Sequence, residues 1–168
     1  MDMTPTKYLA SGSESAEQTA LFMWATMAGR FGYAAADDDM SYEVANHAIS
    51  TYGPINGPNA VPELLDMFAI PNGGLRDKIT ASNLKREGVK PGIPDVLLPV
   101  ARGGWHGLFI EMKRRTTGRG KTRKQKGSAS DEQNEWATRL RKRGYGVLVT
   151  VGFEEAKKAI REYLSQQG

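Results

Sequence analysis

Two acidic residues and a lysine near the middle of the chain have the types and spacing needed for chemistry on a phosphate. Asp95 begins the apolar run DVLLPV, and Glu111 and Lys113 end the apolar run HGLFIEMK. Both runs are rich in Val, Ile, Leu and Phe, which predicts two β-strands. The linking ARGGW contains a glycine pair suited to a hairpin turn. The sequence therefore predicts two adjacent antiparallel strands.

The hairpin register decides whether these side chains meet. In an antiparallel pair the numbers of opposed residues add to a constant. A turn centred on the first glycine of the pair, or between the two, makes that sum 206 or 207, so Asp95 lies opposite Glu111 or Met112. Glu111 and Lys113 are two residues apart and share one face of their strand. An aspartate, a glutamate and a lysine are thus expected at one end of a ribbon.

This combination suits metal-assisted hydrolysis of a phosphodiester bond. Mg²⁺ prefers oxygen ligands and is usually held by one or two carboxylates together with water. Asp95 and Glu111 supply such oxygens, and the backbone carbonyl of Met112 is a further candidate ligand. Lys113 is a candidate to orient or help deprotonate the attacking water and to stabilise charge on the phosphate. The alternative is a cross-strand ion pair on a solvated sheet face, contributing roughly 0.2–1 kcal/mol.

The elements that must position these residues follow in the second half of the chain. A helix is expected to begin near Ser130, where Ser130 and Gln133 fit a capping box, and to end at Gly144 with Trp136 and Leu140 on its inner face. Residues 145–151 are a continuous apolar run, which predicts a buried strand. A last helix is predicted over residues 153–164, with its apolar face inward.

The first half of the chain is less regular. Residues 1–12 are expected to be a flexible lead-in. Apolar residues at helical spacing then predict a helix that Ser13 caps and that Gly29 or Gly32 ends. Residues 32–60 contain several Gly and Pro and are interpreted as an insertion, with a short helix around residues 42–50. Residues 63–70 are a short amphipathic segment, and residues 77–88 predict a helix closed by Gly88.

The composition is that of a single globular domain. The chain has 168 residues, of which 39% are hydrophobic and 25% charged, and no apolar run approaches the ~20 residues of a membrane span. Cysteine is absent, which excludes disulfides and thiolate metal sites, and no secretory signal is visible. A cytoplasmic location is therefore expected. The net charge is +4, and the run KRRTTGRGKTRKQK lacks any acidic residue. A basic loop over residues 114–129 is suited to gripping phosphates, with a solvated loop as the alternative.

These motifs, in this order, resemble those of the VRR-NUC domain within the PD-(D/E)xK nuclease superfamily. The matching segments are GVKPGIPDVLLPV, HGLFIEMKR and SDEQNEWATRLRKRGYGVLV. They contain a Gly-x-Pro-Asp, an apolar strand ending in Glu-x-Lys, and a Gln that opens the next helix. The upstream segments SESAEQTALFMWA and PELLDMFAIPNGGLRDKITASNLKREG also look like those of phage and bacterial members. The chain departs from the family pattern in the 32–60 insertion and in a longer basic loop.

The resemblance implies an α/β fold with a restriction-endonuclease-like core, in which helices flank a mixed central sheet. Its element order is α-β-β-β-α-β, and one of the three successive strands is not located by the sequence. It also implies a Mg²⁺- or Mn²⁺-dependent endonuclease acting on DNA, in the host cytoplasm if the chain is phage-encoded. The family includes enzymes specific for branched, flap or nicked DNA. Such enzymes often act as pairs, so a homodimer is a candidate.

The resemblance further assigns roles to single residues. The two metal carboxylates, the catalytic lysine and the glutamine that completes the site match Asp95, Glu111, Lys113 and Gln133. The family also has a glutamate on the first helix, as a further catalytic residue and metal ligand. Glu14 fits its spacing best, with Glu17 as the alternative.

Basic residues around the site are candidates to contact nucleic acid. They are Arg76, Arg114, Arg115, Lys121, Arg123 and Lys124. A structural ion pair is the alternative for Arg76. Two other functions stay open: a non-catalytic nucleic-acid-binding module with a vestigial site, and a nuclease that acts on RNA. Salt-sensitive binding without hydrolysis would distinguish the first of these from an enzyme.

Overall fold

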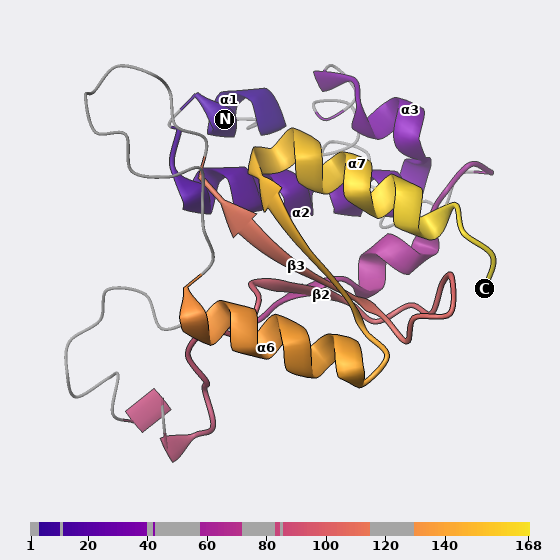
Figure 1. Ribbon diagram of the computed structural model, residues 1–168. Helices are drawn as coiled ribbons and strands as arrows, with labels where there is room; N and C mark the ends of the chain where they lie inside the picture. The colour runs from indigo at the N-terminus through magenta and orange to yellow at the C-terminus, as the bar shows by residue number, and fades with distance from the viewer. Residues whose placement is uncertain are drawn as a thin grey trace.

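The protein is built around a mixed four-stranded sheet. The computed structural model describes residues 4–10, 12–39, 42, 58–71, 83–84, 86–114 and 130–168. The strands are β1 (Phe68–Ala69), β2 (Val96–Leu98), β3 (Leu108–Lys113) and β4 (Gly146–Val151), in the spatial order β1-β2-β3-β4. The first three pair antiparallel, whereas β3 and β4 are parallel (Figure 1). The predicted α/β class with a mixed sheet is confirmed.

Helices cover both faces of this sheet. Those described are α1 (Pro5–Leu9), α2 (Glu14–Phe31), α3 (Tyr33–Ala36), the 3₁₀ helix η1 (Pro62–Asp66), α6 (Asp131–Lys142) and α7 (Gly152–Leu164). In Figure 1, α2 and α7 lie on one side of the strands and α6 lies on the other. Parallel strands need a crossover connection, and α6 lies in the one between β3 and β4. Among the helices that the structure describes, none has the length and apolar character to cross a bilayer.

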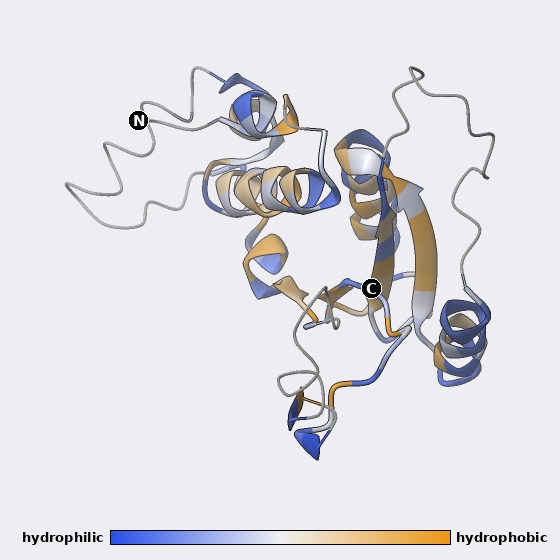
Figure 2. Ribbon diagram, turned by 90° about the vertical axis from the view of Figure 1, so that its left-hand side faces the viewer, coloured by the Kyte–Doolittle hydropathy of each residue, from blue (hydrophilic) through white to orange (hydrophobic). Residues whose placement is uncertain are grey.

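Alternating side chains along β3 build an apolar layer on each face of the sheet. Three of them pack into the larger core beside α2 and α7: Leu108, Ile110 and Met112. Phe109 faces the other way, into a smaller cluster with Leu140 of α6. Successive residues of a strand point to opposite faces, so Glu111 lies on the α6 side with Phe109. Figure 2 shows apolar strands next to α6, whose side away from the sheet is hydrophilic.

The β2–β3 hairpin has the register that places Asp95 opposite Glu111. Val96 pairs with Ile110, so opposed residue numbers add to 206 along the strands. One step beyond this pair, toward the start of β2, Asp95 and Glu111 face each other. Of the two alternatives expected from the turn, Glu111 rather than Met112 is therefore the opposed residue.

The turn of the hairpin lies between its two glycines. Gly103 and Gly104 have φ values of +56° and +80°, which a two-residue hairpin turn of this kind requires. Arg102 bridges Trp105 across them, a pairing that adds to 207. The change to 206 along the strands means that one extra residue lies between Leu98 and Arg102, as in a β-bulge.

Two helices begin where the sequence predicts. α2 follows Ser13, whose hydroxyl accepts the N–H of Ala16 at 3.1 Å, and ends at Gly32 with φ +92°. The capping box of α6 is complete. Ser130 Oγ accepts the N–H of Gln133, and the Gln133 side chain accepts the N–H of Ser130. Both predictions are confirmed.

The prediction of a flexible lead-in is wrong for Pro5–Leu9, which form α1. Thr4 caps this helix by accepting the N–H of Lys7 at 3.4 Å. Pro5 stands in the first turn, where a missing N–H costs no helical hydrogen bond. The Thr-Pro pair is thus the helix-start signal in this segment.

Strands β1 and β4 differ from what the sequence predicts. β1 is the strand that the sequence did not locate, and its Phe68 pairs with Leu97 of β2. The prediction that the last strand is buried is wrong in its middle, because Leu148 and Val149 are 40% and 45% exposed. Among the strands that the structure describes, β4 lies at the edge of the sheet, so its apolar composition does not come from burial on both sides.

The beginning of the 32–60 segment packs onto α7. Asp37 accepts a hydrogen bond from Arg161 of α7 at 2.5 Å and also pairs with Lys157 at 3.5 Å. Trp24 of α2 donates its ring N–H to the same carboxylate. The start of this segment is therefore anchored to the α2–α7 layer, while the helix expected around residues 42–50 lies outside the described residues, Tyr42 excepted.

The helix predicted over residues 77–88 also lies largely outside the described residues. Its end is described: Gly88 has φ +100°, and the N–H of Val89 donates to the carbonyl of Leu84 at 2.9 Å. This is the glycine-terminated helix end that was expected.

Candidate active site

Asp95 lies immediately before β2, on the sheet face that α6 covers. Its Oδ2 accepts a hydrogen bond from the backbone N–H of Met112 at 2.8 Å. The bond crosses from β2 to β3 next to Glu111. It therefore holds the Asp95 carboxylate at the end of the ribbon, beside the second carboxylate.

Glu111 is the buried carboxylate of the site, with 5% of its surface exposed. Its Oε1 accepts hydrogen bonds from Lys113 Nζ at 2.7 Å and from Gln133 Nε2. Its Oε2 is buried and has no hydrogen-bond partner among the residues that the structure describes. A buried acceptor without a partner is costly. This oxygen has bonding capacity for a ligand.

The surroundings of Glu111 disfavour its charged form. Burial raises the pKa of its carboxyl group above the ordinary value of 4.5, while the hydrogen bond and charge of Lys113 act in the opposite direction. The charges of Asp95 and Glu14 raise the pKa further. A positive charge additional to Lys113 would therefore stabilise the ionised carboxylate.

Gln133 joins α6 to these side chains. Its Oε1 accepts the N–H of Ser130 at 2.9 Å and a hydrogen bond from Lys113 Nζ at 3.0 Å, and its Nε2 donates to Glu111 Oε1. The same amide thus caps the helix and orients both partners on β3. The sequence predicted the cap and the site residue separately, and the structure places both on one side chain.

The two candidate glutamates of the first helix lie in different environments. Glu14 is the exposed first residue of α2, and its charge acts on the carboxyl group of Glu111. Glu17 is 4% exposed, and its Oε2 accepts the N–H of Phe153, near the start of α7, at 2.7 Å. The charge of Glu14 therefore influences the site, whereas the side chain of Glu17 connects α2 to α7.

The donor set fits a hard cation bound by few protein ligands. In the described parts of the chain, no three side chains of His, Cys, Asp or Glu form a group that could hold a metal ion by themselves. Asp95, Glu111 and Glu14 are therefore not a closed three-carboxylate cage. Mg²⁺ is commonly held by one or two carboxylates and water. The unpartnered Oε2 of Glu111 fits that mode of binding.

A family model matches the region that contains this site. The model of the VRR-NUC domain matches residues 69–153, just over half of the chain. The chain belongs to the VRR-NUC nuclease family. The match runs from β1 to the start of α7 and includes every site residue except those on α2.

A solved structure supports the same assignment. A VRR-NUC domain protein is 27% identical in sequence, with a TM-score of 0.50, over 74% of this chain and 88% of that one. No curated protein matches the chain. The mixed sheet and its flanking helices, with this neighbour, are consistent with the restriction-endonuclease-like fold. As a nuclease-family member, the VRR-NUC chain has a nucleic acid as its substrate.

The basic residues expected to contact nucleic acid fall mostly outside the described residues of this VRR-NUC chain. Arg114 is described and is exposed directly after Lys113 at the end of β3. The five that lie outside are Arg76, Arg115, Lys121, Arg123 and Lys124. Of the six basic candidates, only Arg114 is located by the structure, and it lies next to the catalytic candidate Lys113.

A contact that the sequence did not predict braces the turn before β2 against α6. Trp136 Nε1 donates to the carbonyl of Pro91 at 2.9 Å. Gly92 has φ +77°, and a Cβ there would lie 2.8 Å from Cβ of Glu132. Only glycine combines this backbone conformation with so close an approach. The sequence predicted that Trp136 faces inward. It stands three residues after Gln133 on the same helix, and this spacing was the only sequence signal for its hydrogen bond to Pro91.

Proposed function

We propose that this VRR-NUC domain is a metal-dependent endonuclease that hydrolyses phosphodiester bonds in DNA. The observation that carries the proposal is the bonding of Glu111. One of its oxygens binds Lys113 and Gln133, and the other is buried without a partner among the described residues. The charge of Asp95 also acts on this carboxyl group. A carboxylate in this state is suited to ligating a divalent cation.

The proposed cation is Mg²⁺ or Mn²⁺, the kind of ion that nucleases of this family generally use. The proposed ligands are the carboxylates of Asp95 and Glu111 and the backbone carbonyl of Met112. Glu14 is proposed as a further ligand that reaches the ion through water, because the three carboxylates do not form a metal-holding group by themselves. When bound, the ion supplies Lewis-acid stabilisation of the phosphoryl group. The residues of the chain hold these ligands in place, because Asp95 is tied to β3 and Glu111 to α6.

Lys113 and Gln133 have complementary roles in this proposal. Lys113 donates to Glu111 and Gln133, so its amine is fixed at the edge of the site. From there it orients or helps deprotonate the attacking water and stabilises negative charge on the phosphate. Gln133 keeps Lys113 from turning away, because it is itself held by the capping box.

The proposed substrate is DNA with a branch, flap or nick. The basic run after Lys113 favours a polyanion, and the family resemblance extends to structure-specific enzymes that often act as pairs. Two other functions use the same surface: a binding module with a vestigial site, and a nuclease acting on RNA. The side chains of Glu111, Lys113 and Gln133 are hydrogen-bonded to one another, and Asp95 is held beside them by the N–H of Met112, which favours hydrolysis over binding alone.

The test is a cleavage panel of single-stranded, duplex, nicked, flap and four-way DNA, with RNA, in Mg²⁺ and in Mn²⁺. We expect cleavage of a branched, flap or nicked DNA that stops in EDTA. Asp95→Ala and Lys113→Ala should abolish cleavage while DNA binding survives. Lys158→Ala, an exposed lysine on α7, is the matched control and should cleave normally.

Each result of that panel has a meaning. Undiminished cutting by both purified site variants would refute the assignment of the active site. Salt-sensitive binding without hydrolysis would establish the binding module. Cleavage of RNA alone would establish the other alternative.

A further inference from the structure

One flank of α6 carries an arginine that is held against an aromatic ring. Arg139 Cζ lies 4.1 Å from the centroid of the Trp136 ring. Trp136 is itself fixed, because its ring N–H donates to the carbonyl of Pro91 at 2.9 Å. The Arg139 side chain is 43% exposed, its Nε is buried, and its two Nη groups have no hydrogen-bond partner among the described residues. The structure therefore holds this guanidinium group in place while its outer donors stay available.

A second arginine lies beside the first. Arg143 follows one helical turn later, and its Nη1 donates to the backbone carbonyl of Arg139 at 3.3 Å. Glu135 approaches Arg139 Nε only to 3.9 Å and is 69% exposed, so this ion pair contributes little. In the described part of the chain, Arg143 has no acidic partner. The arginine flank, formed by Trp136, Arg139 and Arg143, thus keeps most of its positive charge.

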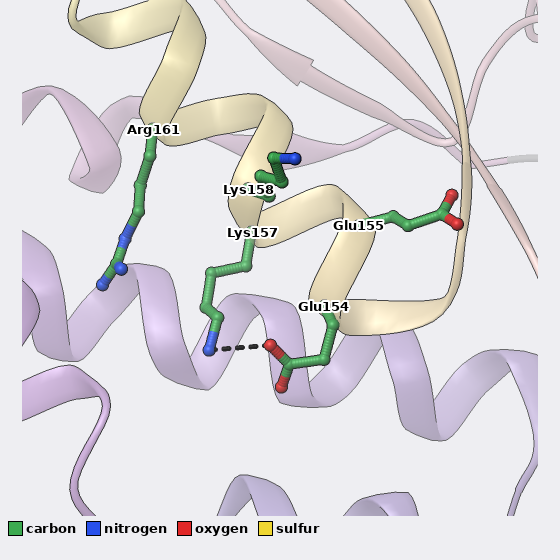
Figure 3. Close-up of a pocket in the computed structure, with 5 residues that line it drawn as sticks. All are labelled: Glu154, Glu155, Lys157, Lys158 and Arg161. Carbon is green, nitrogen blue, oxygen red and sulfur yellow. Dashed lines mark ion pairs between the residues drawn. The ribbon is translucent and has the colours of Figure 1, made fainter.

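The basic side chains of α7 differ from this flank, because neighbouring carboxylates balance their charges. Lys157 pairs with Glu154 at 2.9 Å and with Asp37 at 3.5 Å. Figure 3 shows the first of these pairs in an open hollow on the helix. Arg161, which also lines the hollow, pairs with Asp37. Between the two helices, the arginine flank of α6 is therefore the surface that favours a polyanion.

The arginine flank starts next to the candidate active site. Gln133, which donates to Glu111, stands three residues before Trp136 and six before Arg139 on the same helix. At about 1.5 Å per residue, Arg139 lies roughly 9 Å along α6 from Gln133. Successive nucleotides of a DNA strand are about 3.4 Å apart along the duplex. A strand that leaves the site along α6 therefore brings its second or third phosphate to Arg139.

We propose that Arg139, supported by Trp136 and assisted by Arg143, binds a backbone phosphate two or three nucleotides from the bond that is cleaved. This subsite rests on the proposed function, because the cleaved bond defines its place. A guanidinium group suits the contact, since its planar fork donates two hydrogen bonds to one phosphate. Stacking on Trp136 positions the fork before the substrate arrives, which lowers the entropy lost on binding. The contact reads no base and accepts any sequence.

The salt dependence of binding tests the phosphate contact without hydrolysis. Anisotropy of a fluorescein-labelled four-way DNA junction is measured in EDTA, from about 50 to 200 mM salt. Each phosphate contact steepens the fall of log K with log salt by about 0.9. Arg139→Ala should remove about this much of the slope, whereas Arg139→Lys keeps the charge and should keep the slope. The matched control is Lys142→Ala, which removes an exposed charge from the same helix and should leave the slope unchanged.

A neutral phosphate analogue locates the contact on the strand. Single methylphosphonates, which lack the negative charge, are placed at successive positions of the junction strand that is cleaved. The wild type should bind severalfold more weakly when the second or third phosphate from the cleaved bond is neutral, and Arg139→Ala should be insensitive there. Circular dichroism checks that each variant is folded.

The outcomes separate this subsite from the proposed function. An unchanged salt slope for Arg139→Ala, an equal decrease for Lys142→Ala, or a methylphosphonate effect that persists in Arg139→Ala would overturn the phosphate contact. The expected salt slopes in a protein that cuts no substrate would refute the endonuclease and still support the contact, because binding in EDTA needs no hydrolysis.

Discussion

Among single residues, Glu111 is the one whose burial and proposed role place opposite requirements on its charge. It is buried, which disfavours its charge, yet the proposed chemistry needs it ionised. Lys113 offsets only part of the effect of burial on the charged form, because the pKa of the carboxyl group stays raised. The folded protein thus binds a proton at Glu111 more tightly than the unfolded chain does. This one side chain links stability, pH and metal binding.

The first prediction is that Glu111→Gln is more stable than the wild type in EDTA at neutral pH. Gln resembles the protonated carboxyl group, so it avoids the cost of a buried charge. Stability that comes from the neutral form is complete below the ordinary pKa of 4.5 and is lost as pH rises through the raised value. We expect a Tm increase of roughly 2–4 °C near pH 7 that disappears near pH 4. A lower Tm for the variant at neutral pH would contradict this account.

The second prediction concerns metal affinity and pH. A proton and a cation compete for the Glu111 carboxylate, so Mn²⁺ affinity should fall as pH falls through the raised pKa. Calorimetric titration with Mn²⁺ at several pH values measures this directly. Affinity that stays constant until the pH drops below 4.5 would show that Glu111 does not limit binding.

At the scale of elements, the site is held by contacts between segments that are not neighbours in sequence. α6 reaches β3 through Gln133 and reaches the turn before β2 through Trp136. α2 reaches the N-terminus of α7 through Glu17, where a carboxylate also suits the positive end of the helix dipole. These contacts fix the elements that present the candidate ligands.

The third prediction separates the two glutamates of α2. Glu17→Ala leaves the buried N–H of Phe153 without its acceptor and should cost about 1–3 kcal/mol of unfolding free energy. Glu14→Ala removes an exposed charge and should cost less than about 1 kcal/mol, but should weaken Mn²⁺ binding. Urea denaturation and metal titration of both variants distinguish the roles. Exchanged effects would assign Glu17 as the ligand.

The fourth prediction concerns the brace on the turn before β2. Trp136→Phe keeps an aromatic ring and loses the hydrogen bond to Pro91, which should cost about 0.5–1.5 kcal/mol and lower kcat because the turn leads into Asp95. Trp105→Phe, at the exposed hairpin tip, is the matched control and should change neither quantity. Equal kcat for both variants would show that the hydrogen bond between Trp136 and Pro91 does not contribute to catalysis.

At the scale of the whole molecule, the site lies where two layers meet. The α2–α7 layer supplies the larger core on one face of the sheet, and α6 covers the other. Asp95 and Glu111 belong to the hairpin between these layers, and Glu14 belongs to the far layer. A ligand that binds all three would therefore stabilise the fold as a unit.

The fifth prediction is that divalent metal raises the Tm. Binding at a hundred times its Kd stabilises a folded protein by about 2.7 kcal/mol. Differential scanning fluorimetry in Mn²⁺ and in EDTA should therefore show a rise of several degrees for the wild type. Asp95→Asn should lose that rise, whereas Lys158→Ala should keep it. A metal-induced shift of equal size in the Asp95 variant would exclude this carboxylate as a ligand.

Local patterns in the sequence were sufficient for much of the fold. The hairpin follows from two apolar runs around a glycine pair, and α6 follows from its capping box, because both depend on residues close together in the chain. The opposition of Asp95 and Glu111 is one of the two registers that the glycine pair allowed, and the extra residue between Leu98 and Arg102 selects it. α1 and β1 were missed because a five-residue helix and a two-residue strand produce almost no periodic signal.

The sequence by itself determined which residues could form a site and on which elements they stand. Only the tertiary structure decided that Gln133 binds Glu111, that Glu17 accepts the N–H of Phe153 of α7, and that β4 lies at the edge of the described sheet. The physical reason is the distance along the chain over which these contacts form. Glu17 and Phe153 are 136 residues apart, and no local pattern of spacing encodes which surface a helix will meet.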